Sequence, residues 1–441
     1  MKILLIAPAP SPLSRAPRAP SVHVLALHLL AGITPAPHQV TLIEEGPERV
    51  DLDEPCDLVG ISCSTPTVTR AYQLADAFRQ RGRRVVLGGV HPTKRPDEAL
   101  LHSDAVIRGE AEGVWAALLA DAEKGLLQKT YQGPTPELTD YVPMSRRKAA
   151  PGSLLCAVAM ETTRGCPFHC DFCAVTDFYG SKLRHRPTQH LVRDLRESGA
   201  RSVAFLDDNI VGDPRYAREL FRALIPLGIQ WSARGSIAFA RHPDLLKLAR
   251  ESGCVAFDCE IETIAPSNPK NFTKSMKDLR GLEDGIRRIQ DHGIHLNASL
   301  LFGFDGDTKA AFPEALDFLS RHRVATARFG VLTPYPGTRL HETLKAQGRL
   351  LTLDWRHYDG DTVVFRPHQL TPVELLEGVH WMKREFTRFG AVLSRYVRGN
   401  ARHPLLHFRW NAALRRELGG HGERSRTLQN SILPGSTAPI A

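Results

Sequence analysis

Residues 161–173 read ETTRGCPFHCDFC and place three cysteines, Cys166, Cys170 and Cys173, at spacings of four and three. Thiolate sulfur is a soft ligand that suits iron–sulfur clusters and zinc. A compact loop can turn three thiolates towards one metal centre. Three thiolates ligate three irons of a four-iron cluster and leave the fourth iron open to a small molecule. No fourth cysteine follows at a similar spacing. The stretch therefore predicts an iron–sulfur cluster with one open position.

Other interpretations of these cysteines are weaker. A structural zinc site takes four protein ligands, commonly as paired Cys-x-x-Cys arms, and only His169 lies nearby. A disulfide would leave an odd cysteine and is typical of small secreted domains. Inert buried cysteines are common as single residues. Burial alone does not explain three cysteines within eight positions.

Length and composition bound the class of protein. A chain of 441 residues predicts two or three domains with sizeable cores. Hydrophobic content of 42% and charged content of 24% are ordinary for a soluble globular protein. No apolar run approaches the length that spans a bilayer, so no transmembrane segment is expected. Eight cysteines, three of them in one tight loop, favour a reducing cytoplasm and metal chemistry over a disulfide framework.

The chain is basic, with a formal charge of +9 and a pI near 9.2. A basic balance is compatible with nucleic acid or an anionic membrane surface as a partner. The arginines are spread along the whole chain, however, and no platform of interleaved aromatic and basic residues appears. Nucleic acid is therefore not an expected partner.

The first 130 residues alternate buried strand-like runs with helical patterns, which predicts a parallel, doubly wound, Rossmann-like sheet. Such sheets bind ligands at the carboxyl ends of their strands. Two of the expected strand ends carry small hydroxyl residues or paired glycines, which allow a ligand close to the backbone. Tight turns of any flavodoxin-like domain would explain these loops equally well. The candidate residues are Ser62, Ser64, Thr65, Gly88, Gly89 and His91.

Residues 131–152 are rich in Pro, Gly and charge and predict a linker. From 153 to 345, repeated strand–helix units predict a partial (β/α)6 TIM-like barrel with its site at the carboxyl ends of the strands. Amphipathic stretches over 346–418 predict a small helical cap, and 419–441 read as a disordered tail. The polar residues at the expected strand ends are Asp207, Asp208, Asn209, Arg234, Ser236 and Glu262. A helix cap or a cluster of turns is the alternative explanation for Asp207, Asp208 and Asn209.

The Cys-x3-Cys-x2-Cys loop followed by these units resembles the radical S-adenosylmethionine (SAM) superfamily. The strand-end loops ahead of it resemble the cobalamin-binding domain of the B12-dependent radical SAM enzymes. The resemblance implies a [4Fe–4S] cluster on the three cysteines, with SAM on the open iron. It places Phe172 near the adenine and the corrinoid tail against the amino-terminal loops, where His91 is a possible contact. It implies that SAM is held by Asp207, Asp208, Asn209, Arg234, Ser236 and Glu262.

Two departures from the family pattern stand out. The Asp-x-His-x-x-Gly motif, which supplies an axial histidine in many B12 proteins, is absent. Glu260 occupies a position where the relatives have glycine.

The activity that the resemblance implies is C-methylation of an unactivated carbon in a small-molecule or lipid-like substrate. In this chemistry a 5′-deoxyadenosyl radical abstracts hydrogen and methylcobalamin supplies the methyl group. An electron donor such as flavodoxin or ferredoxin would reduce the cluster. Cyclisation, rearrangement or oxidation without methyl transfer is the alternative outcome, and a non-catalytic cobalamin or redox sensor is a more distant one. The identity of the substrate does not follow from the sequence.

Overall fold

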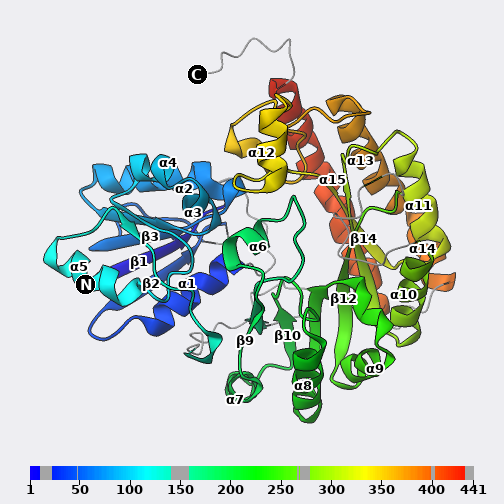
Figure 1. Cartoon of the computed structure of the whole chain (residues 1–441), viewed down its shortest axis with the longest axis horizontal. Helices are drawn as coiled ribbons and strands as arrows, with labels where there is room; N and C mark the ends of the chain where they lie inside the picture. Colours follow the sequence, from blue (N-terminus) through cyan, green and yellow to red (C-terminus); the bar gives the residue numbers. More distant parts are fainter. Residues whose placement is uncertain are drawn as a thin grey trace.

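The computed structural model describes residues 1–9, 22–46, 48–140, 158–265, 268, 279–398 and 403–432. Figure 1 shows two α/β lobes side by side, with the amino-terminal lobe in blue and cyan and the second lobe running from green to red. Among the described residues no helix is both long and apolar enough to cross a membrane. Residues 141–152 of the expected linker lie outside the described residues.

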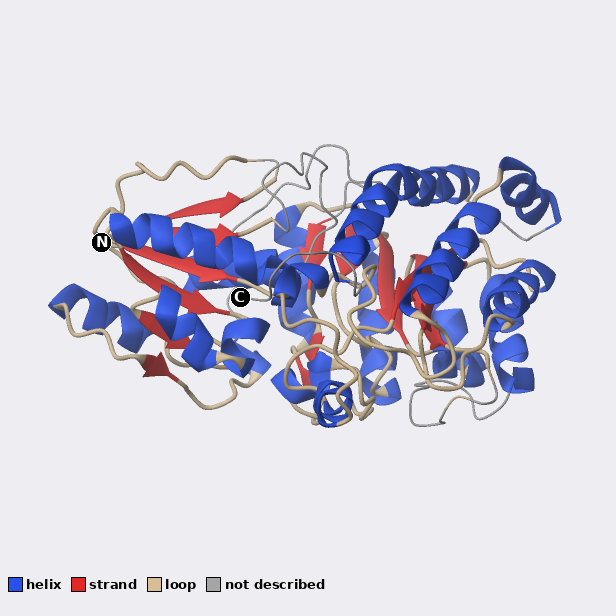
Figure 2. Cartoon of the chain, turned by 90° about the horizontal axis from the view of Figure 1, so that it is seen from above, coloured by secondary structure: helices blue, strands red, loops and turns tan. Residues whose placement is uncertain are grey.

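The amino-terminal lobe is built on one parallel six-stranded sheet with helices on both faces (Figure 2). Residues 3–7 of its first strand are buried, as expected for a central strand covered on both faces. One face of the sheet packs on α1 (Val22–Ile33) and α5 (Trp115–Lys124), and the other on α2 (Thr65–Gln80) and α4 (Pro96–His102). The strands, in spatial order, are β2 (Gln39–Glu44), β1 (Lys2–Ala7), β3 (Leu58–Ser62), β4 (Arg84–Gly88), β5 (Ala105–Ile107) and β6 (Thr130–Tyr131).

The second lobe contains a second parallel six-stranded sheet, whose strands follow one another in chain order. The expectation of a partial (β/α)6 barrel is therefore confirmed. The strands are β7 (Val158–Met160), β10 (Ser202–Phe205), β11 (Gln230–Gly235), β12 (Cys254–Glu262), β13 (His295–Phe302) and β14 (Thr326–Val331). The helices that follow them are α7 (Thr188–Ser198), α8 (Pro214–Leu224), α9 (Pro243–Glu251), α10 (Leu279–Asp291), α11 (Ala311–Arg321) and α12 (Arg339–Ala346).

Helix α8 illustrates how local sequence fixes these units. The Asp213 side chain accepts a hydrogen bond from Arg215 N at 2.8 Å, and Pro214 occupies the first helical turn, where its missing N–H costs nothing. The helix buries Phe221, whose ring stacks on the fully buried Trp231 of β11 at 5.0 Å between centroids. Capping starts the helix and aromatic packing fixes its inward face.

The chain ends in three helices, α13 (Pro372–Phe386), α14 (Phe389–Arg398) and α15 (Pro404–Ile432). The helical cap is as expected, but α15 continues past 419, where the sequence predicted disorder. A tertiary contact explains the difference: the Gln429 side chain accepts from Val363 N at 2.9 Å and donates to Val363 O at 3.1 Å. Residues 433–441 lie outside the described residues.

Helix α15 also covers the amino ends of the barrel strands. Asn411 Nδ2 donates to Ala325 O at 3.1 Å, just before β14, and Leu406 packs on Val255 and Ala256 of β12. The ring of buried His295, the first residue of β13, lies 5.1 Å from that of Trp410. The base of the barrel is therefore closed by the cap.

Acid should weaken this closure. Burial, together with the neighbouring His407 and His403, lowers the pKa of His295 to about 3. Unfolded histidine titrates near 6.5, so between about pH 6.5 and 3 the unfolded state binds a proton that the folded state does not, and stability falls as pH falls. From pH 7 to 5 we expect a loss of about 2 kcal/mol, measured by urea denaturation.

His295→Gln should flatten that pH dependence, whereas His368→Gln, at an exposed position, should retain it. Equal slopes for the two variants would contradict the assignment.

Candidate active site

The three cysteines lie on a loop that a short hairpin holds at both ends. Strands β8 (Thr163–Arg164) and β9 (Arg184–His185) pair in antiparallel fashion, and the loop between them carries α6 (Ala174–Tyr179). The loop begins at Gly165, whose φ is +93° and where a Cβ would lie 2.5 Å from Lys182 O. Only glycine fits such a position without displacing backbone.

Within the loop, Cys166 and Cys170 are buried and Cys173 is half-buried, and none of them is in a disulfide. Cys173 N donates to Cys170 O at 3.0 Å, which fixes the turn between them. Among the described residues, no three His, Cys, Asp or Glu side chains are close enough to hold a single metal ion. Three soft thiolates on one loop fit a [4Fe–4S] cluster, which spreads its ligands over separate corners.

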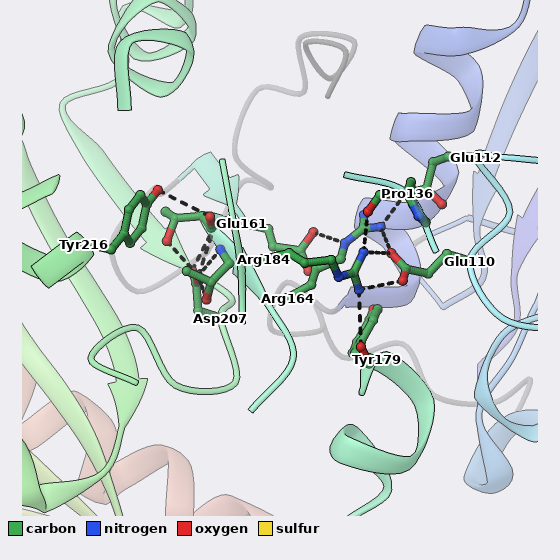
Figure 3. Close-up of polar contacts among 11 residues, drawn as sticks. Glu110, Glu112, Pro136, Glu161, Arg164, Tyr179, Arg184, Asp207 and Tyr216 are labelled. Atoms are coloured by element: carbon green, nitrogen blue, oxygen red, sulfur yellow. Dashed lines mark hydrogen bonds and ion pairs between the residues drawn. The ribbon is translucent and has the colours of Figure 1, made fainter. Parts of the chain in front are cut away.

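Asp207 anchors the start of this loop rather than facing outward. Its Oδ1 accepts hydrogen bonds from Thr162 Oγ1, Thr163 N and Thr163 Oγ1 at 2.7, 2.5 and 2.7 Å (Figure 3). The side chain is buried, and burial raises its pKa against the opposing effect of these donors. The carboxylate of Asp207 thus holds the loop in place, and its contact with SAM stays a prediction.

The side-chain amide of Asn209 uses only one of its two polar atoms within the described residues. Its Oδ1 accepts from Ser236 N at 3.1 Å, whereas its buried Nδ2 has no hydrogen-bond partner among the described residues. The Ser236 hydroxyl accepts from Ala238 N at 3.2 Å. A buried amide without a partner is costly, so Asn209 Nδ2 is a good candidate donor to a ligand.

Further along the strand ends, Arg234 is exposed and its Nε lies 3.5 Å from Asp258 Oδ2 on the neighbouring strand. Glu262 is buried at the end of β12 and adopts φ of +66°, unusual for a residue other than glycine. The pairing of β12 with β13 is irregular between Glu260 and Glu262. Backbone strain of this kind is often found at functional sites. Phe172, half-buried, meets the ring of Phe304 edge-on at 6.1 Å.

A hollow of about 1090 Å³, including its open mouth, lies between the lobes. Residues of α1 and the carboxyl ends of the amino-terminal strands line one side. The other side belongs to the cluster loop and its surroundings: Arg164, Ala174, Val175, Phe178, Tyr179 and Asp208. Most of the lining is aliphatic or aromatic, as in sites for large organic ligands.

The amino-terminal predictions divide at this hollow. Ser62, Gly88 and Gly89 line it. A Cβ on Gly89, whose φ is +101°, would lie 2.4 Å from Cys63 O, so only glycine lets the chain turn here. Glycine is therefore required here by the close approach of the chain to Cys63, and the turn that it allows borders the hollow.

Ser64, Thr65 and His91 do not line the hollow. His91 is fully buried, its Nδ1 lies 3.1 Å from Thr65 Oγ1, and its ring is 5.1 Å from that of Trp355. Ser64 caps α2. The helical turn after Gly89 directs the His91 side chain into the protein interior, and its contact with cobalamin stays a prediction.

One structural feature was not predicted from the sequence: a buried charge network that joins the lobes beside the hollow (Figure 3). Arg164 pairs with Glu110 and Glu112 of the amino-terminal lobe, and its Nε lies 2.8 Å from Glu161 Oε2. Arg184 Nη2 donates to Glu110 Oε1 at 2.6 Å. Burial raises the pKa of Glu161 to about 7, against the opposing effect of Arg164. The only available signal was the pair of carboxylates that follows β5.

A second tie lies nearby. The Lys94 ammonium, on α3 (Val90–Lys94), lies 2.5 Å from Asp177 Oδ2 and donates to Asp177 O at 2.9 Å on α6. Both sets of ion pairs involve the cluster loop or its hairpin. The amino-terminal lobe therefore contacts the element that carries the cysteines directly.

Comparison with known proteins agrees with this architecture. Family profiles match residues 18–119 to the B12 binding domain and residues 160–319 to the Radical SAM superfamily. Bacteriochlorophyllide d C-12(1)-methyltransferase of Chlorobaculum tepidum is 32% identical over 77% of this chain and 76% of its own. Bacteriochlorophyllide d C-8(2)-methyltransferase of the same organism is 29% identical over 79% of this chain and 82% of its own.

Among solved structures, the radical SAM methyltransferase TsrM from Kitasatospora setae, with cobalamin and a [4Fe–4S] cluster bound, superposes with a TM-score of 0.67. At 16% identity over 92% of this chain and 90% of the other, that match concerns the fold. The identity to the bacteriochlorophyllide enzyme extends over both lobes. The chain therefore belongs to the B12-binding radical SAM enzymes, the family that includes these methyltransferases, and its cofactors are a [4Fe–4S] cluster, SAM and cobalamin.

Proposed function

We propose that this protein transfers a methyl group to an unactivated carbon of a small, largely apolar molecule. The observation that carries the proposal is the aliphatic and aromatic hollow to which both lobes contribute, in a chain related over most of its length to a methyltransferase. That relative acts on a bacteriochlorophyllide, so tetrapyrroles are the first substrate class to test. When bound, the cluster with SAM supplies a radical that removes hydrogen from carbon, and cobalamin supplies the methyl group.

The residues would divide between two ligand sites. Cys166, Cys170 and Cys173 would hold the cluster. Asn209 Nδ2, buried and without a partner among the described residues, would donate to SAM. The remaining candidate SAM contacts are Phe172, Asp207, Asp208, Arg234, Ser236 and Glu262. Ser62, Gly88 and Gly89 would receive cobalamin, and no histidine is among the described residues that line the hollow.

The protein would have to hold the site for the cluster and SAM at a fixed distance and orientation from the cobalamin site. Arg164 stands two residues before Cys166, and its partners Glu110 and Glu112 line the hollow. A shift of the cluster loop relative to the amino-terminal lobe would separate buried charges, which costs about 3–5 kcal/mol when one partner is lost. Reactions that need two bound groups in alignment are sensitive to displacements of about 1 Å.

The direct test is turnover. The anaerobically reconstituted protein, given SAM, a reductant and a panel of tetrapyrroles and other apolar acceptors, should give a product heavier by one methyl group, detected by mass spectrometry. The triple variant Cys166→Ala/Cys170→Ala/Cys173→Ala should lose iron and all SAM cleavage. A product that is only oxidised or rearranged would refute methyl transfer, and SAM cleavage by the triple variant would refute the cluster assignment.

Gly89 should control cobalamin binding. Gly89→Ala adds a Cβ where only 2.4 Å separates it from Cys63 O, so the loop must shift and the cobalamin content should fall about tenfold or more. Gly82→Ala is the matched control, because Gly82 also has positive φ but nothing lies within 4 Å of its added Cβ. Extraction and absorbance measure the content, and unchanged cobalamin in Gly89→Ala would contradict this site.

Arg164 should couple the two half-reactions. Arg164→Lys keeps the charge but loses the planar fork that reaches several carboxylates at once. We expect iron content to persist while methylated product per SAM cleaved falls on the order of tenfold or more. The control Arg218→Gln removes a more exposed pair with Asp244 in the same lobe and should leave the ratio unchanged. An unchanged ratio in Arg164→Lys would mean that the network is only structural.

A further inference from the structure

Helix α14 and the first turns of α15 expose an unusual concentration of apolar side chains. Five of the eleven exposed large apolar residues in the described part of the chain lie between 389 and 408. Phe389, Leu393 and Val397, spaced four residues apart, form one stripe along α14 with exposed fractions of 71%, 40% and 71%. The others are Leu405, exposed at 77%, and Phe408, exposed at 37%. We call these five side chains the apolar stripe.

The stripe faces outward because the opposite side of α14 is firmly packed. Arg395 is buried, with its guanidinium 3.7 Å from the centre of the Phe386 ring and a hydrogen bond of 2.8 Å to Phe386 O. His407 Nε2 lies 3.0 Å from Val392 O, and the rings of Tyr396 and Phe408 are 5.0 Å apart. The exposed apolar surface is thus a property of an anchored helix pair.

The charge beside the stripe is mainly positive, although Arg388 Nη1 pairs with Glu385 Oε2 at 2.8 Å. Residues 386–416 contain seven arginines and no aspartate or glutamate. Arg388, Arg409, Arg415 and Arg416 are exposed. An exposed apolar stripe bordered by arginines is the signature of a helix that lies in the interface of an anionic bilayer.

We propose that α14 and the start of α15 dock this enzyme on an anionic lipid surface. The apolar stripe would enter the boundary between headgroups and acyl chains, and the arginines would contact lipid phosphates. Basic residues near such a surface contribute attraction that falls off within a Debye length. This is peripheral docking, which needs no membrane-spanning helix.

Two other occupants fit less well. A second copy docked symmetrically would bring arginine-rich surfaces together, and residues 386–416 offer no carboxylate to pair with them. A nucleic acid would satisfy the arginines through its phosphates but would leave Phe389, Leu393 and Val397 in water. Only an anionic lipid surface matches both the apolar and the basic parts.

The position of the apolar stripe also fits docking on a lipid surface. Asn411 binds the chain just before β14 and so fixes α15 there. The apolar stripe therefore lies at the base of the barrel, away from the strand ends that carry the site. Figure 1 shows α14 at the opposite end of the molecule from the amino-terminal lobe. A docked enzyme would keep the hollow between the lobes accessible.

Co-sedimentation of the full-length reconstituted enzyme with vesicles tests the proposal. We expect binding to phosphatidylcholine vesicles that contain phosphatidylglycerol, weakening with salt, and little binding to phosphatidylcholine alone. Phe389→Ser/Val397→Ser should lower the partition coefficient about tenfold or more. Arg409→Gln and Arg416→Gln should each lower it about fivefold.

The matched control is Leu101→Ser/Leu126→Ser, which removes two side chains of similar exposure, 73% and 66%, from the other lobe. It should bind vesicles like the parent. Iron and cobalamin contents should be equal in all variants, which separates this test from that of the methyl transfer.

Three outcomes would overturn the proposal. The first is equal binding by the parent and Phe389→Ser/Val397→Ser. The second is a dimer, seen by light scattering without lipid, that the same substitutions dissociate. The third is tight binding of duplex RNA or DNA in place of vesicles.

Discussion

The structure depends on burying Arg164 and Arg184 against three glutamates at the junction of the lobes. Isolated buried charges are expensive, so each of these side chains requires its partners in place. Arg164 belongs to the hairpin that presents the cysteines, whereas Glu110 and Glu112 belong to the loop after β5. One network therefore ties the amino-terminal sheet to the cluster loop. Apolar contact joins the lobes as well, because Trp355, Tyr358 and Val364 pack into the hydrophobic core of the amino-terminal lobe.

The sequence predicted features that depend on neighbouring residues. The cysteine spacing, the strand–helix alternation and the glycines after β4 are local patterns, and each predicted its element. Asp207, Asn209 and Glu262 were recognised as strand-end residues, but their orientations were not predictable. Asp207 turns inward to Thr162 and Thr163, and Asn209 keeps one donor free among the described residues. Side-chain direction depends on packing partners that sequence spacing does not specify.

The other differences between prediction and structure also arise from packing partners, which here are distant in the sequence. His91 follows a ligand-facing glycine pair, yet one helical turn directs it to Thr65 and Trp355. Arg164 and its partner Glu110 are separated by more than fifty residues. Carboxylates that follow a strand do not by themselves indicate which arginine will pair with them. The polar, glycine-containing end of α15 reads as disorder, because Val363, which holds Gln429, is far away in the chain.

The partial barrel leaves β14 at one margin of its sheet. An uncovered margin strand offers free backbone groups to any other chain and is a common starting point for aggregation. Here α13 and α15 pack against β14, and α15, about 43 Å long if regular, runs from the base of the barrel to Val363, which is buried in the core of this lobe. Because helices of the cap pack against this edge strand, β14 is less open to pairing with a strand of another chain.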